Sequence, residues 1–260
     1  MLTKKQIQQL KALENKKERE FSGTFLAEGE KLVGEIVASG WPVSALYATA
    51  DWPLLSDRTL SLQGYRVTLV SDDELKRISL LKNPRYVVAV VKKPLAPPLS
   101  HALFADWSLF LDTVQDPGNM GTILRIADWF GIRQVVATPD SVDAFHPKVV
   151  QSTMGAIMRV TVHTLTPADF FEQKARLAPE VPVYGAALNG DNLYGTSFAA
   201  PGVLVMGNES KGISFETARY INRLLLIPPF GSGSETSESL NVAVATAIIC
   251  AEIRRQQNCI

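Results

Sequence analysis

The sequence predicts an α/β protein of two domains, and three observations indicate this. Apolar, β-branched runs alternate with amphipathic stretches along the chain, as strands and helices do around a mostly parallel sheet. Three prolines within residues 94–98 favour an extended linker. The length of 260 residues suits one large core or two small ones. We therefore predict a small N-terminal domain over residues 1–95, a linker over 96–104 and a second domain over 105–260.

The first domain is expected to be a small α/β domain. Ile7, Leu10 and Leu13 form a narrow apolar stripe at helical spacing within residues 4–20. Three acidic residues at 72–74 favour the start of a short helix, because they complement the helix dipole. A further helix is expected over 31–39, and strands over 25–29, 43–47, 67–70 and 86–91.

The second domain repeats the alternation more regularly, which predicts the mostly parallel sheet. Its expected strands are 109–111, 134–138, 160–163, 183–187, 203–206 and 224–227. Its expected helices are 119–130, 147–156, 167–177, 215–221 and 240–256. In open sheets of this kind, ligands bind beyond the carboxyl ends of the strands.

Composition excludes several classes of protein. No apolar run is long enough for a membrane span, and the polar N-terminus lacks the apolar centre of a signal peptide. Cys250 and Cys259 form no metal-ligand spacing, so reduced thiols and a cytoplasmic location are expected, without a metal. Residues 1–100 carry a charge of +4 and residues 101–260 a charge of −4, so a polyanion would prefer the N-terminal part, although an uneven solvated surface explains the charge equally well.

Three polar turns follow apolar strands in the second domain. The first contains Asn119, Gly121 and Arg125, and an arginine at this place in a helix can hold a phosphate or polarise an oxygen. The second is the segment 207–212, Gly-Asn-Glu-Ser-Lys-Gly, whose exposed backbone could bind the edge of a flat ring. The third is Ser-Leu-Asn at 239–241, at the start of a helix rich in small residues. Each turn alone is also consistent with an ordinary helix cap or loop.

The ordered set of turns resembles the motifs of the SpoU/TrmH family of SPOUT methyltransferases. The N-x-G-x-x-x-R motif is matched from Asn119 to Arg125, and the G-x-E motif by Gly207 and Glu209. The third motif is matched by Ile-Pro at 227–228 and Ser-Leu-Asn-Val at 239–242. The segments 16–19 and 25–29 are similar to the substrate-binding domain of members that act on ribosomal RNA, a domain that itself resembles ribosomal RNA-binding proteins.

The resemblance implies methyl transfer from S-adenosylmethionine to a ribose 2′-hydroxyl of RNA. It also implies a trefoil knot around the cofactor site and a homodimer formed through the C-terminal domain. The residues implied in catalysis are Arg125, Asn119, Glu209, Ser239 and Asn241. Those implied in cofactor binding are Gly207, Asn208, Ile227, Leu240 and Ala187. The stretch between Pro228 and Ser239 is longer than in many relatives, which leaves the register of Leu240 open.

Arg125 is expected to act as a positioning group and not as a base. A guanidinium keeps its proton at physiological pH, so Arg125 is a poor base. We expect it to position the ribose or a phosphate and to stabilise developing alkoxide charge, while the proton leaves to solvent, phosphate or Glu209.

Three alternatives remain at this point. The chain could be a catalytically silent RNA-binding or ribosome-assembly factor on the same scaffold, or it could methylate a base nitrogen. It could also modify transfer RNA, although the N-terminal domain favours ribosomal RNA.

Overall fold

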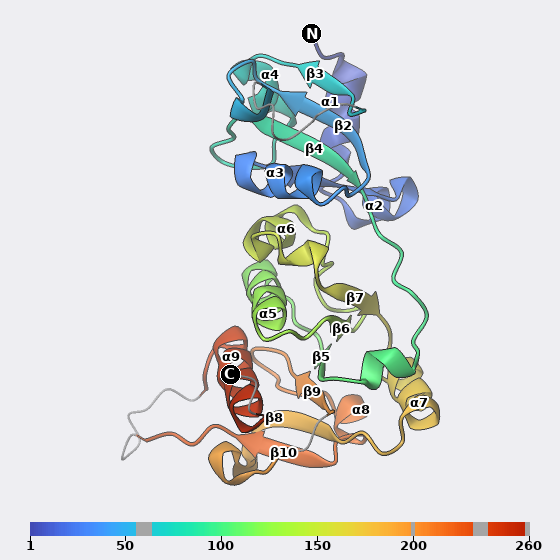
Figure 1. Cartoon of the computed structure of the whole chain (residues 1–260), viewed down its shortest axis with the longest axis vertical. Coiled ribbons are helices and arrows are strands. Elements are labelled where there is room, and N and C mark those ends of the chain that lie inside the picture. Colours follow the sequence, from blue (N-terminus) through green and yellow to red (C-terminus); the bar gives the residue numbers. More distant parts are fainter. Residues whose placement is uncertain (56–63, 199–200, 231–238, 258–260) are drawn as a thin grey trace. The chain divides into compact units, whose positions relative to one another are not determined.

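The computed structural model describes residues 1–55, 64–198, 201–230 and 239–257 (Figure 1). By its contacts the chain divides into two compact units. The first unit combines Met1–Leu95 with Asp143–Met158, and the second combines Ala96–Val142 with Arg159–Ile260. No helix in the described ranges is both long and apolar enough to cross a membrane.

The first unit contains a mixed four-stranded sheet. Its strands, in spatial order, are β1 (Thr24–Glu28), β4 (Val87–Lys92), β2 (Val43–Ala48) and β3 (Val67–Leu69). Only the β2–β3 pair is parallel. The helices of this unit are α1 (Lys4–Ala12), α2 (Lys16–Ser22), α3 (Glu30–Ala38), α4 (Asp72–Ile78) and α6 (Pro147–Thr153). A core of Leu10, Leu26, Leu75 and Val88 joins α1 and α4 to the sheet.

The helical stripe expected over residues 4–20 is broken into two helices, α1 and α2. The α1 helix starts at a capping box in which Thr3 and Gln6 exchange hydrogen bonds. The break follows from Asn15, whose side chain accepts a hydrogen bond from the amide of Lys17 and so starts a new helix. A single helix was therefore the wrong expectation, because a strong capping residue lies inside the apolar pattern.

Arg19, within the basic stretch 16–19, is buried in the first unit. Its side chain is 1% exposed, and its guanidinium lies 2.7 Å from the carboxylate of Asp143. It also donates to the carbonyl oxygens of Leu13 and Glu14. Arg19 therefore holds the unit together, whereas its neighbours Lys16 and Lys17 remain exposed.

The second unit contains a six-stranded sheet in which all neighbouring strands are parallel. The strands, in spatial order, are β10 (Arg223–Leu226), β8 (Val183–Asn192), β9 (Val203–Met206), β5 (Ser108–Leu111), β6 (Gln134–Ala137) and β7 (Thr161–Thr164). The predicted α/β class with a parallel sheet is thus confirmed. The trefoil knot stays a prediction, and most of the long stretch before Ser239 lies outside the described residues.

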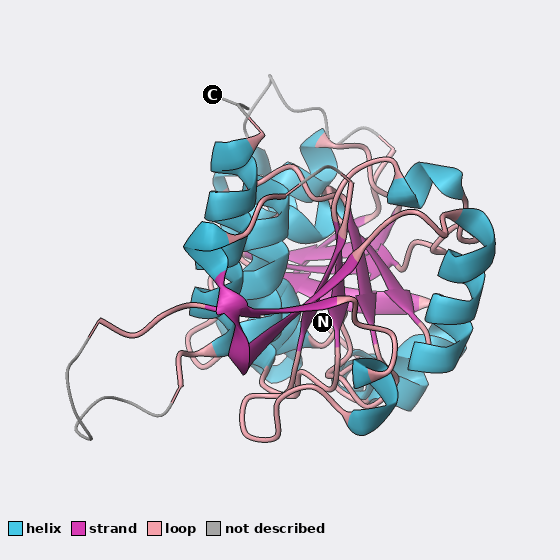
Figure 2. Ribbon diagram, turned by 90° about the horizontal axis from the view of Figure 1, so that it is seen from below, coloured by secondary structure: helices cyan, strands magenta, loops and turns pink. Residues whose placement is uncertain are grey.

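Helices flank the second sheet on both sides (Figure 2). They are α5 (Pro117–Trp129), α7 (Pro167–Leu177), α8 (Phe215–Ala218) and α9 (Val242–Gln256). The α5 and α9 helices pack on each other, and α7 packs on α8. Phe110 of β5 stacks on Phe170 of α7, with 5.2 Å between the ring centroids. Burial of both sheet faces explains why the strands read as continuous apolar runs.

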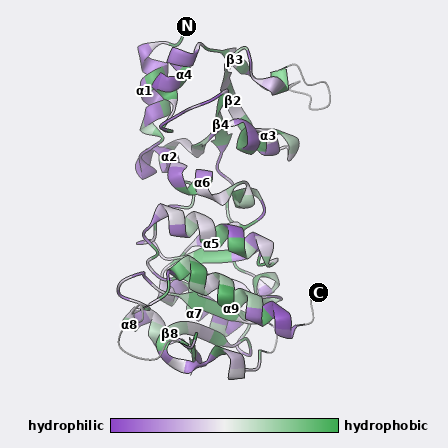
Figure 3. Ribbon diagram, turned by 90° about the vertical axis from the view of Figure 1, so that its left-hand side faces the viewer, coloured by the Kyte–Doolittle hydropathy of each residue, from purple (hydrophilic) through white to green (hydrophobic). Residues whose placement is uncertain are grey.

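The thiol of Cys250 is expected to be inert in the folded protein. It lies fully buried in α9, most of which is hydrophobic (Figure 3), and burial raises its pKa to about 12. Because the thiolate is the reactive form, iodoacetamide at pH 8 should modify Cys250 only after unfolding in guanidinium. Mass spectrometry of the peptide checks this, and rapid labelling of the native protein would contradict it.

Candidate functional site

A cavity of about 430 Å³ lies in the second unit, where β9 and β10 reach their carboxyl ends beside the middle of β8. The pairing of β10 with β8 jumps there from Gly185 to Asp191, and the intervening residues supply one wall. The segment 207–213 and the start of α9 supply the others. This volume falls in the range of small-molecule and cofactor sites.

Gly207 allows the segment after β9 to fold back on itself. The backbones of Asn208 and Gly212 exchange two hydrogen bonds of 2.9 Å, which closes a tight loop. A Cβ atom at position 207 would lie 2.3 Å from the carbonyl carbon of Gly212. Only glycine fits this approach of two backbones. The closed loop places residues 207–213 along the cavity.

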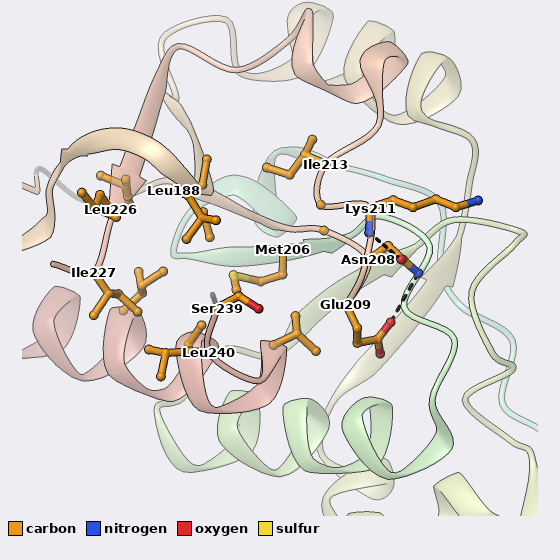
Figure 4. A pocket seen from close by; sticks show the side chains of 18 of the residues that line it. Leu188, Met206, Asn208, Glu209, Lys211, Ile213, Leu226, Ile227, Ser239 and Leu240 are labelled. Atoms are coloured by element: carbon orange, nitrogen blue, oxygen red, sulfur yellow. Dashed lines mark hydrogen bonds between the residues drawn. The ribbon is translucent and has the colours of Figure 1, made fainter. Parts of the chain in front are cut away.

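The cavity has an apolar end and a polar end (Figure 4). Leu226, Ile227 and Leu240 surround the apolar end, whereas Asn208 and Glu209 mark the polar end. Apolar side chains at one end and polar residues at the other suit a flat heteroaromatic ring with hydrogen-bonding edges. A nucleoside-like cofactor therefore fits the residues present.

A chain of side-chain hydrogen bonds links the three polar turns of the second unit. Asn241, the N-cap of α9, accepts from the amide of Ala243 through its Oδ1, so its Nδ2 faces outward. That Nδ2 donates to Oδ1 of Asn119 at 2.9 Å. The Nδ2 of Asn119 in turn donates to Oε1 of Glu209 at 2.9 Å. Because Oδ1 of Asn241 already caps α9, its Nδ2 is the group left to donate, and this fixes the direction of both bonds that follow. Glu209 therefore acts only as an acceptor.

A second set of polar contacts, which the sequence did not predict, holds the residues of this hydrogen-bond series in place. The amide side chain of Asn208 donates to the carbonyl of Thr113 at 2.8 Å and to Oε2 of Glu209 at 3.3 Å. Asp112, 2% exposed, accepts from the amide of Ser214 at 2.7 Å. Thr113 adopts a left-handed φ of 61°, unusual for a β-branched residue. An Asp-Thr pair directly after a buried strand was the one signal that could have revealed them.

Most of the predicted site residues lie together at one cavity in the structure. The cavity is lined by Ala187, Gly207, Asn208, Glu209, Ile227, Ser239 and Leu240. Asn119 and Asn241 reach it through Glu209. Asn119 was expected to begin its helix, but α5 begins at Pro117 and Asp116 is its cap, so Asn119 lies in the first turn.

Arg125 stands apart from the cavity lining. It is exposed on α5, and within the described ranges its guanidinium has no hydrogen bond or ion pair. An unpaired arginine is available to a phosphate or a reacting oxygen of a bound molecule.

The direction of the hydrogen bonds predicts a paired rescue. Asn119→Asp places a second carboxylate against Glu209, so the specificity constant for the methyl transfer that the family resemblance implies should fall about tenfold or more. Adding Glu209→Gln reverses that bond, retains the others and should recover most of the loss. Steady-state kinetics of the single and double variants measures this.

The control for this rescue removes an equal charge elsewhere in the unit. Glu216, exposed on α8, is the matched acid, so Asn119→Asp with Glu216→Gln should stay as slow as Asn119→Asp alone. Equal recovery in both double variants would show that net charge, and not the bond to Asn119, governs the rate.

Known proteins resemble both parts of the chain. Residues 106–251 match the model of the SpoU rRNA Methylase family, and residues 4–89 match the MRM3-like substrate binding domain. The chain is 33% identical, over 95% of each sequence, to the 23S rRNA (guanosine(2553)-2′-O)-methyltransferase RlmP of Bacillus subtilis.

Solved structures match over nearly the whole chain. A structure assigned to the TrmH family of RNA methyltransferases, from Porphyromonas gingivalis, is similar with a TM-score of 0.85 and 41% identity, over 98% of this chain and 99% of that one. The SpoU methyltransferase AviRb of Streptomyces viridochromogenes, in complex with AdoMet, is similar with a TM-score of 0.83 and 27% identity, over 98% of both chains.

Proposed function

Because the chain belongs to the SpoU rRNA methylase family, we propose that it transfers a methyl group from S-adenosylmethionine to a ribose 2′-hydroxyl of ribosomal RNA. One observation carries the proposal. The three polar turns meet at a cofactor-sized cavity, in a chain that aligns over 95% of its length with a named 23S rRNA 2′-O-methyltransferase.

The cavity residues would hold S-adenosylmethionine. When bound, this cofactor supplies a methyl group already activated by its sulfonium. Gly207 and Ile227 would contribute backbone groups for the adenine edge, and Ala187, Asn208 and Leu240 would close the walls. The side-chain amide of Asn208 and its backbone N–H and C=O are already bonded within the protein, so Asn208 would shape the wall of the site.

The polar turns would orient the reacting hydroxyl. The 2′-oxygen must approach the methyl carbon in line with the departing sulfur, so positioning is the main task of the protein. Asn119, Glu209 and Asn241 fix one wall of the site, with Ser239 beside them at the cavity. Arg125 would bind the ribose or an adjacent phosphate and stabilise negative charge as the proton leaves.

The proposal also assigns roles to the two domains and a homodimeric state to the protein. Residues 1–95 would bind RNA and residues 105–260 would form the catalytic domain, apart from the segment 143–158, which packs with the first unit. Trp129 on α5 is 86% exposed and Val244 on α9 is 49% exposed, so a second copy would cover them in a homodimer. The proposal also includes a cytoplasmic location and a trefoil knot around the cofactor site.

The test of this function is the chemical form of the product. The purified protein is incubated with methyl-labelled S-adenosylmethionine and unmodified 23S ribosomal RNA, and the RNA is hydrolysed in alkali. Ribose methylation blocks cleavage, so label should appear in resistant dinucleotides. Label in mononucleotides would indicate base methylation, and no label with bound cofactor would indicate a silent RNA-binding factor.

A further inference from the structure

The second half of α4 and the segment that follows it are strongly basic. Residues 75–105 contain six lysines and arginines and no acidic residue. Four of the six are exposed and lie in the last turn of α4 or in the following turn, residues 79–86, which we name the basic turn. The four residues are Lys76, Arg77, Lys82 and Arg85. This local excess of positive charge stands out in a chain of zero net charge.

The two cations of the basic turn are available to a ligand. In the part of the chain that the structure describes, Lys82 and Arg85 form no ion pair. Lys76 lies 3.9 Å from Asp73, but both side chains are mostly exposed, so this pair is weak. The exposed carboxylates of Asp72 and Asp73 lie at the start of α4, whereas the basic turn itself contains no acidic residue to compete with a polyanion.

A buried carboxylate anchors the start of the basic turn. Glu28, at the end of β1, is 4% exposed and accepts hydrogen bonds from the hydroxyl of Ser79 and, at 3.0 Å, from the amide of Leu80. Burial raises the pKa of Glu28, because the charged form loses hydration. The protein therefore bears a desolvation cost to fix this turn.

The end of the basic turn is fixed as well. The carbonyl of Tyr86 accepts a hydrogen bond of 2.8 Å from the amide of Thr49. Tyr86 adopts a left-handed φ of 64°, which is uncommon for a bulky residue. With both ends held, Lys82 and Arg85 lie on a backbone of fixed shape, and little conformational entropy of the backbone is lost when they bind.

We propose that the last turn of α4 and the basic turn form a contact surface for the phosphate backbone of ribosomal RNA, with Lys82 and Arg85 as its contact residues. Glu28 and Ser79 are positioning residues beneath it. The inference rests on the proposed function, because ribosomal RNA is the polyanion that such an enzyme must bind. Phosphate contacts would fix the register of the RNA without reading its sequence.

Salt-dependent binding tests the surface. Binding of the full-length protein to deproteinised 23S ribosomal RNA is measured between 50 and 200 mM KCl for the wild type and for Lys82→Ala/Arg85→Ala. Each lost phosphate contact should reduce the slope of log affinity against log salt by about 1, so we expect a decrease of about 2. At 100 mM salt the affinity should fall about tenfold or more.

Two matched variants control for charge and folding. Lys4→Ala/Lys5→Ala removes the same charge from exposed lysines of α1 and should retain the wild-type slope. Lys82→Arg/Arg85→Lys keeps the charge and should bind within about threefold of the wild type. Equal loss in both alanine variants, or no loss in either, would overturn the proposal.

Ser79→Ala tests the anchor. It removes the hydroxyl that bonds Glu28 but leaves all four cations, so it should weaken binding about threefold to tenfold with a smaller change of slope. Wild-type affinity in this variant would exclude a positioning role for Ser79.

Failure of the surface is separable from failure of the proposed function. If the wild type methylates ribose but Lys82→Ala/Arg85→Ala binds RNA normally, the surface is wrong and the function stands. If the slope changes as expected but the wild type transfers no methyl group, the surface stands and the function is wrong. Binding of S-adenosylmethionine should be equal in all of these variants, because the cavity residues lie in the other unit.

Discussion

Arg125→Lys is expected to lower the turnover number at least about a hundredfold while S-adenosylmethionine binds with wild-type affinity. Loss of one donor to a developing oxyanion typically costs a factor of this size. Lysine keeps the positive charge but loses the planar fork of donors that can hold a ribose oxygen and a phosphate together. Arg125 does not line the cavity, so cofactor binding should not depend on it.

Single-turnover kinetics and calorimetry with the cofactor measure the two quantities separately. Arg133→Lys is the matched control, because Arg133 is exposed in the same unit but precedes β6, at the amino ends of the strands. Near-normal turnover of Arg125→Lys would remove Arg125 from the reaction. A weakened cofactor affinity would show instead that the substitution disturbs the cavity.

Gly207→Ala is expected to weaken cofactor binding about tenfold to a hundredfold, with loss of turnover at low cofactor concentration. The added methyl group meets backbone atoms of Gly212 and Ile213 at 2.3 and 2.4 Å, and backbone cannot move aside as a side chain can. The loop must open, and overpacking of this kind costs about 1–3 kcal/mol. Asn208 and Glu209 would shift with it.

Gly195→Ala is the control for that substitution. No atom lies within 4 Å of a Cβ built at Gly195, and its φ is not in the left-handed region, so alanine should be tolerated. Calorimetry with S-adenosylmethionine compares the two variants, and thermal unfolding checks that both are folded. Equal affinity in Gly207→Ala and Gly195→Ala would contradict the close backbone approach at Gly207.

The parallel sheet of the second unit could be predicted from local pattern. Runs such as Val203–Met206 are apolar throughout because both faces of the sheet are covered. The meeting of the polar turns also follows from topology, since β5 and β9 are neighbours and end at one edge. The periodicity of the sequence is therefore enough to predict the parallel sheet and its flanking helices.

The bonds inside the candidate site could not be predicted in this way. Asn119 and Glu209 are 90 residues apart, and Asn119 and Asn241 are 122 apart, so no local pattern pairs them. The burial of Arg19 against Asp143, across 124 residues, is a similar case, because a lysine-rich stretch gave no reason to expect it. The anchoring of the basic turn could not be predicted either, because Glu28 lies in β1, 51 residues from Ser79.

The central claim is that this chain methylates ribose in ribosomal RNA, and mapping ribose methylation across total RNA tests it most directly. Cells with the intact gene are compared with cells that lack it and with cells that carry Arg125→Lys. We predict that methylation disappears at a 2′-hydroxyl of ribosomal RNA in both altered strains and that transfer RNA is unchanged. Identical methylation maps in all three strains, or a loss confined to transfer RNA, would contradict the claim.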